Sequence, residues 1–316
     1  MKGAMKIAPS FYKRNGVGFM VSKRNIKKYL TGYMFILPNL LGFLIFVLLP
    51  VVFSFLLSFC EWNLFSGISG IRFIGVKNFQ EMAKSEIVLK SLANNLVFSL
   101  FTVLFIVALS LMLALLLNRK LIGKSVLRGM FFFPYVSNIV AICIVWMALF
   151  NRDSGPINML LANLGVSSVP GWLTDGAWAL PSIMIVTIWI NVGYVMVIYL
   201  AGLQGVPEEL YEAAQMDGAN ALQKFFSVTL PCISPTTFFV VIITLINSFK
   251  VFGPVNIMTQ GGPGDSTYVL VYYIFITAFR HYRMGYGAAM AWLLFVIIFA
   301  ITLVQWRGQK KWVSYM

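Results

Sequence analysis

Long stretches without charged residues alternate with short polar segments along this chain of 316 residues. No Asp, Glu, Lys, Arg or His occurs within residues 29–60, 91–118 or 176–207. Each range leaves room for the roughly 20 residues that an α-helix needs to cross the hydrocarbon of a membrane. The sequence therefore predicts an all-α membrane protein with six transmembrane helices. The predicted spans cover about residues 30–59, 92–117, 130–150, 179–203, 236–257 and 285–305.

The end of the chain leaves one choice open. From Ser266 to Trp306 the sequence is apolar apart from residues 280–287. One unbroken helix over this range would be about 60 Å long, twice the thickness of the hydrocarbon. A seventh span at 267–279 would carry the basic C-terminal residues to the other side of the membrane. We therefore predict a short interfacial or partly inserted helix at 267–279 on the outer face, and a sixth span that begins near Gly285.

Composition and charge agree with this assignment. Hydrophobic residues make up 59% of the chain and charged residues only 11%, which excludes a soluble domain. The net charge is +14, but the bases cluster beside the predicted spans rather than in a nucleic-acid-binding pattern. Sixteen of the 24 lie on one side of the membrane, eight of them in residues 1–28. Because basic residues are retained in the cytoplasm, both termini are predicted there. The predicted parts are a basic cytoplasmic segment (1–28), a transmembrane domain (29–306) and a basic tail (307–316).

Nothing in the sequence predicts catalysis or a metal site. The three cysteines, Cys60, Cys143 and Cys232, fall at different predicted depths and suggest neither a disulfide nor a metal centre. Residues 118–125, "NRKLIGKS", come nearest to a phosphate-binding loop, but they begin with Asn where such a loop needs Gly. We therefore predict that the chain is not an enzyme and holds no cofactor or metal of its own.

An acidic segment at 204–235 interrupts the apolar pattern on the predicted cytoplasmic side. Pro207 suits the first position of a helix, and Gly218 suits its end. Asn220 followed by Gln223 predicts the cap of a second short helix. Pro231 and Pro235 are expected to stop that helix, and Leu222, Phe225 and Phe226 fall on one face of it. The segment is either a plain connector or a rigid two-helix knob that fits a partner; its two helices and slender Glu-Ala-Ala face favour the knob.

The motif in this segment resembles the EAA loop of the membrane subunits of ATP-binding-cassette importers. The matching residues are Glu212-Ala213-Ala214, Gly218 and Leu230-Pro231, with Val228 in place of the usual Ile. Four other stretches resemble the carbohydrate-uptake branch of that family: "FIGVKNF" (73–79), "SFKVFGPVNIMTQGGPG" (248–264), "MGYGAAMAWLLF" (284–295) and "QKKWVSY" (309–315). Gly253 departs from the branch, in which many members carry an acid.

The resemblance implies a type I importer permease fold and an assembly of several subunits. Such a permease pairs with a second, different permease in the bacterial or archaeal cytoplasmic membrane. Two cytoplasmic ATPase subunits bind ATP and magnesium, and an extracytoplasmic binding protein delivers the sugar. Alternating access is coupled to the ATPases through the EAA loop. By this resemblance the coupling residues are Glu212, Ala213, Ala214, Asp217, Gly218, Leu230 and Pro231.

Polar residues inside the predicted spans are candidates for the path of the solute, because they are costly in hydrocarbon. The candidates are Tyr135, Asn138, Asn191, Tyr194, Thr244, Asn247, Ser248 and Lys250. Their amide, hydroxyl and aromatic groups suit a sugar. The same residue types also join helices to one another, and for any single residue that structural role is the more common one. Lys250 can reach outward to water or meet an acidic solute.

Three other functions remain open from the sequence. An anionic or phosphorylated polyol could replace the sugar as solute. An independent secondary transporter would need a buried proton relay or inverted repeats, and no predicted span contains Asp or Glu. A membrane anchor that recruits a cytoplasmic partner without transport is the third.

Overall fold

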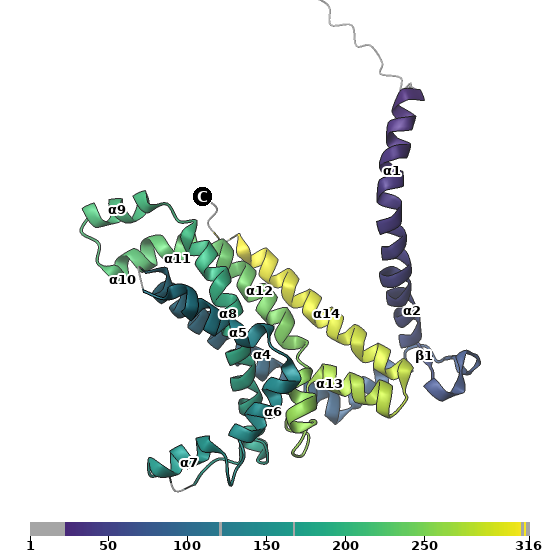
Figure 1. The fold of residues 1–316 in the computed structure, drawn as a ribbon. Helices are drawn as coiled ribbons and strands as arrows, with labels where there is room; N and C mark the ends of the chain where they lie inside the picture. The colour runs from purple at the N-terminus through teal and green to yellow at the C-terminus, as the bar shows by residue number, and fades with distance from the viewer. Residues whose placement is uncertain (1–22, 120–121, 167, 311–312, 314–316) are drawn as a thin grey trace, which may run out of the picture. The chain divides into compact units, whose positions relative to one another are not determined.

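The computed structural model describes residues 23–119, 122–166, 168–310 and 313 (Figure 1). Most of the predicted basic segment 1–28 and part of the predicted tail 307–316 lie outside these residues. The chain divides into two compact units, residues 1–53 and 54–316.

The first unit is helical wherever it is described. Helix α1 (Lys23–Phe43) continues through a π-helical turn, η1 (Leu44–Leu48), into α2 (Leu49–Ser58), whose last residues belong to the second unit. The apolar part, Thr31–Ser58, has 28 residues and is long enough to cross a membrane. The first predicted span is therefore confirmed as a helix.

The second unit is built around two long helices, α4 (Glu86–Asn118) and α8 (Gly176–Gln204), which pack along each other. On α4 the buried residues recur every three or four positions, as a helix with one covered face requires: Phe98, Thr102, Ile106, Ser110, Ala114 and Leu117. The Ser110 hydroxyl donates a hydrogen bond of 2.8 Å to the Val192 carbonyl and joins the two helices inside the core. Helix α14 (Met284–Gln309) is the remaining continuous candidate span.

Short elements precede α4. Strands β1 (Cys60–Glu61) and β2 (Arg72–Phe73) form an antiparallel pair, and two 3₁₀ turns, η2 (Leu64–Ser66) and η3 (Ile68–Gly70), lie between them. Helix α3 (Lys77–Lys84) follows.

These short elements are tied to the start of α14. The Arg283 guanidinium donates two hydrogen bonds of 2.7 Å to the Glu81 carboxylate. This charged donor lowers the pKa of Glu81 from its ordinary value. The Arg283 guanidinium also lies 4.6 Å from the centre of the Tyr286 ring.

The third predicted span, 130–150, is wrong as a single helix. Helices α5 (Lys124–Val136) and α6 (Ile139–Leu149) replace it and meet at a bend of 98°. The Asn138 side chain accepts a hydrogen bond of 2.8 Å from the Val140 amide and so starts a new helix at the bend. The short helix α7 (Pro156–Asn163) then leads to α8.

The fifth predicted span, 236–257, also differs from the structure. Helix α12 (Ser234–Phe249) ends eight residues early, and a π-helical turn, η5 (Val255–Thr259), follows. Pro254 has no amide hydrogen to donate to the preceding turn, so the helix is interrupted at residues 250–252 and a separate helical segment begins at Gly253. By length and composition the described residues contain four candidate spans, or up to six if each bent pair counts as one.

The helix predicted at 267–279 is present as α13 (Leu270–Phe275) and the π-helical turn η6 (Ile276–Arg280). It packs against α4 and α14, and Val269, Leu270 and Tyr272 are fully buried. Protein therefore covers most of this helix, and its predicted interfacial or partly inserted position on the outer face stays a prediction.

One buried side chain joins three of the helices. Asn95 on α4 accepts a hydrogen bond of 2.6 Å from the Leu270 amide at the start of α13. Its amide group also donates to the Phe249 carbonyl, the last of α12, at 3.4 Å. Asn95 is fully buried, so these two backbone groups have a partner where water is absent.

We expect Asn95→Leu to reduce the stability of the folded protein by about 1–3 kcal/mol, because it leaves buried backbone groups without a partner. Thermal unfolding of the purified protein in detergent measures the effect. Gln204→Leu replaces an exposed amide on α8 and serves as the control, with a change within about 0.5 kcal/mol. Equal unfolding temperatures for Asn95→Leu and the control would contradict the role of this side chain.

Candidate functional site

The acidic segment forms the predicted hairpin. Helix α9 (Glu208–Met216) begins one residue later than predicted, since Pro207 precedes its first residue. Gly218 ends the turn with φ of +78°, where glycine has no steric penalty, and the Ala219 amide donates to the Ala214 carbonyl at 2.9 Å. The predicted cap of the second helix is confirmed, because Asn220 and Gln223 bond reciprocally at 2.9 and 2.8 Å.

The second helix of the hairpin is longer than predicted. It runs through α10 (Ala221–Lys224), a π-helical turn, η4 (Phe225–Thr229), and α11 (Leu230–Cys232). Pro231 lies inside it and does not stop it. The chain bends by 67° at the buried Ile233 and enters α12 directly. The hairpin is therefore continuous with α12 through a single residue.

Side-chain contacts hold the two arms of the hairpin together. The Tyr211 hydroxyl and the Thr229 hydroxyl lie 3.0 Å apart, and Lys224 donates to the Gln215 side chain at 3.2 Å. Val228 and Thr229 on the second arm are buried. These bonds cross from one arm to the other, so the hairpin is a stiff unit rather than a loose connector.

The seven predicted coupling residues divide into two groups. Glu212, Ala213, Asp217 and Gly218 are exposed on the hairpin, whereas Ala214, Leu230 and Pro231 are half-buried. Ala214 packs against the apolar core under the hairpin, so its small side chain serves internal packing. Four large apolar side chains are also exposed on this hairpin: Leu210, Met216, Leu222 and Phe226.

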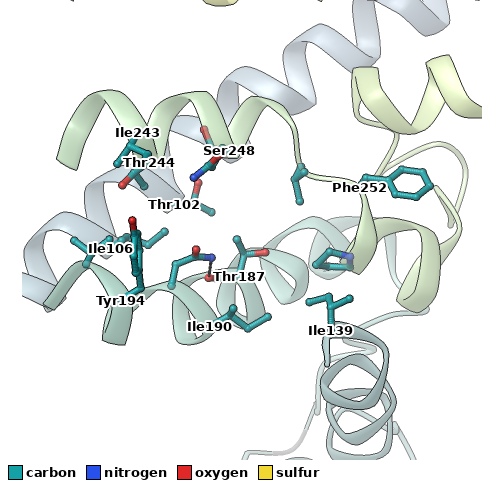
Figure 2. A pocket seen from close by; sticks show the side chains of 15 residues that line it. Thr102, Ile106, Ile139, Thr187, Ile190, Tyr194, Ile243, Thr244, Ser248 and Phe252 are labelled. Atoms are coloured by element: carbon teal, nitrogen blue, oxygen red, sulfur yellow. Dashed lines mark hydrogen bonds between the residues drawn. The ribbon is translucent and has the colours of Figure 1, made fainter. Parts of the chain in front are cut away.

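A cavity of about 200 Å³ lies between α4, α8 and α12, as Figure 2 shows. Its middle is polar, and apolar side chains lie at its ends. Ile106, Tyr194 and Ile243 lie toward one end, and Ile139 and Phe252 lie toward the other (Figure 2). Along α4 and α8 the cavity falls between two buried apolar clusters. The polar residues that line it are Thr102, Thr187, Asn191, Thr244, Asn247 and Ser248.

Five of the eight residues predicted for the solute path line this cavity: Asn191, Tyr194, Thr244, Asn247 and Ser248. The other three, Tyr135, Asn138 and Lys250, lie elsewhere. The Tyr135 ring stacks on the Tyr194 ring, with centres 4.3 Å apart and planes within 8°. Asn138 caps α6, and Lys250 is exposed just beyond α12. The two helix breaks move Asn138 and Lys250 out of the helical faces that the sequence pattern assumed.

Thr102 and Thr187 also line the cavity, although the sequence analysis missed them. Thr187, Asn191 and Tyr194 are spaced at i, i+4 and i+7, which places all three on one face of α8. That spacing could have identified Thr187. Thr102 carried no comparable signal, because it is one of several small polar residues on α4.

The polar groups around the cavity are only partly bonded to protein. Asn191 donates to the Thr187 carbonyl at 2.8 Å, and Ser248 donates to the Leu245 carbonyl at 2.7 Å. The hydroxyls of Thr187 and Thr244 are buried without a protein partner. The described lining residues include no Asp, Glu, Lys, Arg or His. The cavity therefore offers uncharged donors and acceptors and two aromatic rings, those of Tyr194 and Phe252.

Close packing of α5 on α8 determines where the Tyr135 ring lies. Gly193 has no side chain, and a methyl group there would overlap the backbone of Phe131 and Phe132. This contact lets α5 approach α8 beside Tyr194. The Tyr135 ring then covers the Tyr194 ring at one end of the cavity.

Comparison with known proteins adds independent evidence. Residues 106–307 match the model of a family described as "Binding-protein-dependent transport system inner membrane component". These residues include the whole hairpin and all but one of the residues that line the cavity.

Two relatives and one solved structure show how far the similarity extends. The chain is 36% identical to the probable ABC transporter permease protein YesP of Bacillus subtilis, over 95% of this chain and 97% of the relative. It is 33% identical to the trehalose/maltose transport system permease protein MalF of Thermococcus litoralis, over 90% and 95% of the two chains. The fold matches a chain of a bacterial alginate ABC transporter with a TM-score of 0.79 and 24% identity, covering 92% of this chain and 98% of that one.

Gly193→Ala is expected to push α5 away from α8 and to cost about 1–3 kcal/mol of stability, as overpacking in a core does. Thermal unfolding in detergent measures the change. Gly129→Ala is the control, because Gly129 lies on the neighbouring helix α5 and a methyl group there meets nothing within 4 Å. The close approach is not required if both variants unfold at the wild-type temperature.

Proposed function

This chain belongs to the family of binding-protein-dependent transport system inner membrane components, and we propose that it imports a neutral sugar or oligosaccharide. The resemblance predicted from the EAA motif is confirmed by the family match and by the permease relatives. The chain is thus a membrane permease component. Its solute, its partners and its orientation in the membrane are parts of the proposal.

One observation carries the choice of solute: an uncharged polar cavity lies in the middle of an apolar helical bundle. Sugars present many hydroxyl groups, each able to donate and accept hydrogen bonds, and apolar ring faces that stack on aromatic side chains. Asn191, Asn247 and Ser248 provide amide and hydroxyl partners, and Tyr194 provides a ring. The similarity to the trehalose/maltose transport system permease protein of Thermococcus litoralis supports this class of solute.

The charge of the cavity favours a neutral solute over a phosphorylated polyol. A phosphate or carboxylate away from water needs a cation or several strong donors beside it. Lys250 does not line the cavity, and the described lining residues are uncharged. The cavity is also smaller than the roughly 300–1,000 Å³ of pockets that enclose a drug-sized ligand. In our proposal the companion permease completes the path around a longer sugar.

We propose that the hairpin docks into a separate ATPase subunit on the cytoplasmic side. Glu212 presents an exposed charge, and the small Ala213 beside it allows close approach of a partner. The exposed Met216, Leu222 and Phe226 supply apolar area that a protein partner would cover. ATP and magnesium would bind to that partner, so this chain needs no cofactor of its own.

The hairpin is connected directly to the helices that line the cavity. Its first arm follows α8 after a short turn, and its second arm enters α12 at Ile233. α8 and α12 together carry five of the six polar lining residues. Because the hairpin is stiff, a displacement at the docked ATPase would move both helices and change access to the cavity.

The solute and partners can be identified from native membranes. The tagged protein is solubilised gently, and the proteins that accompany it are identified by mass spectrometry. We expect a second permease, an ATPase and a binding protein that retains a sugar. A chain that emerges alone, under conditions that preserve other complexes, would contradict the proposed assembly.

Glu212→Lys is expected to leave the protein folded and inserted but to weaken recovery of the ATPase and uptake, because it reverses a charge at the docking surface. Glu208→Lys makes the same charge change one turn earlier on α9 and is the control. Co-purification and uptake are measured for both variants. If Glu212→Lys retains wild-type uptake, Glu212 does not couple the subunits.

Asn191→Leu is expected to lower uptake roughly two- to tenfold, the effect of losing one hydrogen bond of about 0.5–1.5 kcal/mol. Uptake is measured with radiolabelled maltose, trehalose and the sugar recovered from the binding protein. Thr302→Val is the control, because the Thr302 hydroxyl bonds within its own helix, to Ile298, and does not line the cavity. Unchanged uptake by Asn191→Leu, with the ATPase still bound, would make Asn191 a structural residue only.

A further inference from the structure

Helix α7 (Pro156–Asn163) has one face held by the protein and one exposed face. Asn158 holds the inner face: its amide donates to the carbonyls of Arg152 and Pro170 at 3.0 and 3.1 Å. Its side-chain oxygen accepts a hydrogen bond of 2.7 Å from the Trp172 indole. Asn158 is buried, so the orientation of the helix about its own axis is determined.

The outer face of α7 is exposed and mostly apolar, with Asn163 as its one polar residue within the helix. Met159 and Leu160 on the helix are 53% and 62% exposed, and Leu164 just beyond it is 80% exposed. No ionisable residue occurs between Pro156 and Val166. Leaving this area in water costs about 25 cal/mol for each Å². An apolar face next to a transmembrane domain therefore needs an occupant.

Two tryptophans, Trp172 and Trp178, lie where the loop after α7 meets the start of α8. A continuous row of rings joins α8 and α6 to the loop that holds α7: Trp189, Trp146, Phe150, Trp172 and Trp178, with neighbouring centres 5.1–5.6 Å apart. Trp side chains concentrate where hydrocarbon meets water. Figure 1 places α7 beyond α6, at the end of the unit opposite to α9 and α10.

The apolar surface also continues from a transmembrane helix. Ile144 and Val145 on α6 are each 58% exposed, as expected for side chains that face lipid. α7 follows α6 after six residues, and the charged Arg152 and Asp153 stand between the two helices. α7 thus follows a span and a short charged loop. An apolar helix in that place suits the boundary between acyl chains and headgroups.

We propose that α7 lies flat in the membrane leaflet opposite to the hairpin, with Met159, Leu160 and Leu164 among the lipid acyl chains. Amphipathic helices of this kind lie about 5–10 Å deep at the headgroup boundary. The lipid contact holds the α6–α8 connection at constant depth, and with it the bend that follows α5. This inference requires only that the chain is a membrane protein and does not depend on the solute.

Fluorescence quenching in lipid vesicles tests the proposal. Cys60, Cys143 and Cys232 are first replaced by alanine, and one new cysteine is introduced as Leu160→Cys or Leu164→Cys. Asp153→Cys, in the charged loop before α7, is the matched control for an aqueous position. Each cysteine is labelled with the fluorophore NBD, and the complex purified with its native partners is placed in phosphatidylglycerol vesicles that contain brominated phosphatidylcholine.

We expect the labels at 160 and 164 to be quenched by brominated lipid, more strongly by bromine at carbons 6 and 7 than at carbons 11 and 12. Iodide in the water should quench them several-fold less than the label at 153. Equal iodide quenching at all three positions would overturn the proposal. Labels shielded from both quenchers would also overturn it, because they would show that a subunit covers α7. Loss of the lipid quenching when a binding protein is added would overturn it as well.

Discussion

The structure depends on one constraint: a backbone amide or carbonyl group inside a membrane must have a hydrogen-bond partner within the protein. Continuous helices such as α4 and α8 meet it by themselves. The helix breaks at Ser137–Asn138 and after Phe249 do not, and the side chains of Asn138 and Asn95 supply partners there. Asn138 caps one new helix, and Asn95 bonds to both the last carbonyl of α12 and the first amide of α13. Irregular backbone is thereby tolerated close to the cavity that it helps to form.

The cavity and the hairpin are two ends of one mechanical unit. α8 and α12 line the cavity and also lead into and out of the hairpin, with a short turn at one junction and a single bend at the other. Two buried apolar clusters lie on either side of the cavity along α4 and α8. Well-packed clusters of this kind move as bodies rather than deform gradually. Movement of the two clusters relative to each other at the cavity therefore changes few packed contacts. Such a movement suits an alternating-access permease.

Polar residues in and beside the spans have four different roles in this fold. Asn191 and Ser248 line the cavity, Asn95 and Asn138 complete interrupted backbone, and Ser110 joins α4 to α8. Their side-chain chemistry does not distinguish these roles. Tyr135 adds a fourth, since it contacts the ring of a lining residue without lining the cavity. Only the neighbours of each residue reveal which role it has.

The sequence by itself determined the class of the protein, the position of its apolar helices and the hairpin with its Gly218 turn and Asn220 cap, because these follow from hydropathy and from bonds between near neighbours. It also identified five lining residues, because they are polar residues within predicted spans. The tertiary structure decided the rest. The breaks in the third and fifth spans, the burial of α13 and the exposed face of α7 depend on contacts between residues far apart in the chain. Those contacts leave no periodic signal, which is why the sequence predicted neither the protein cover over α13 nor the exposed apolar side chains of α7.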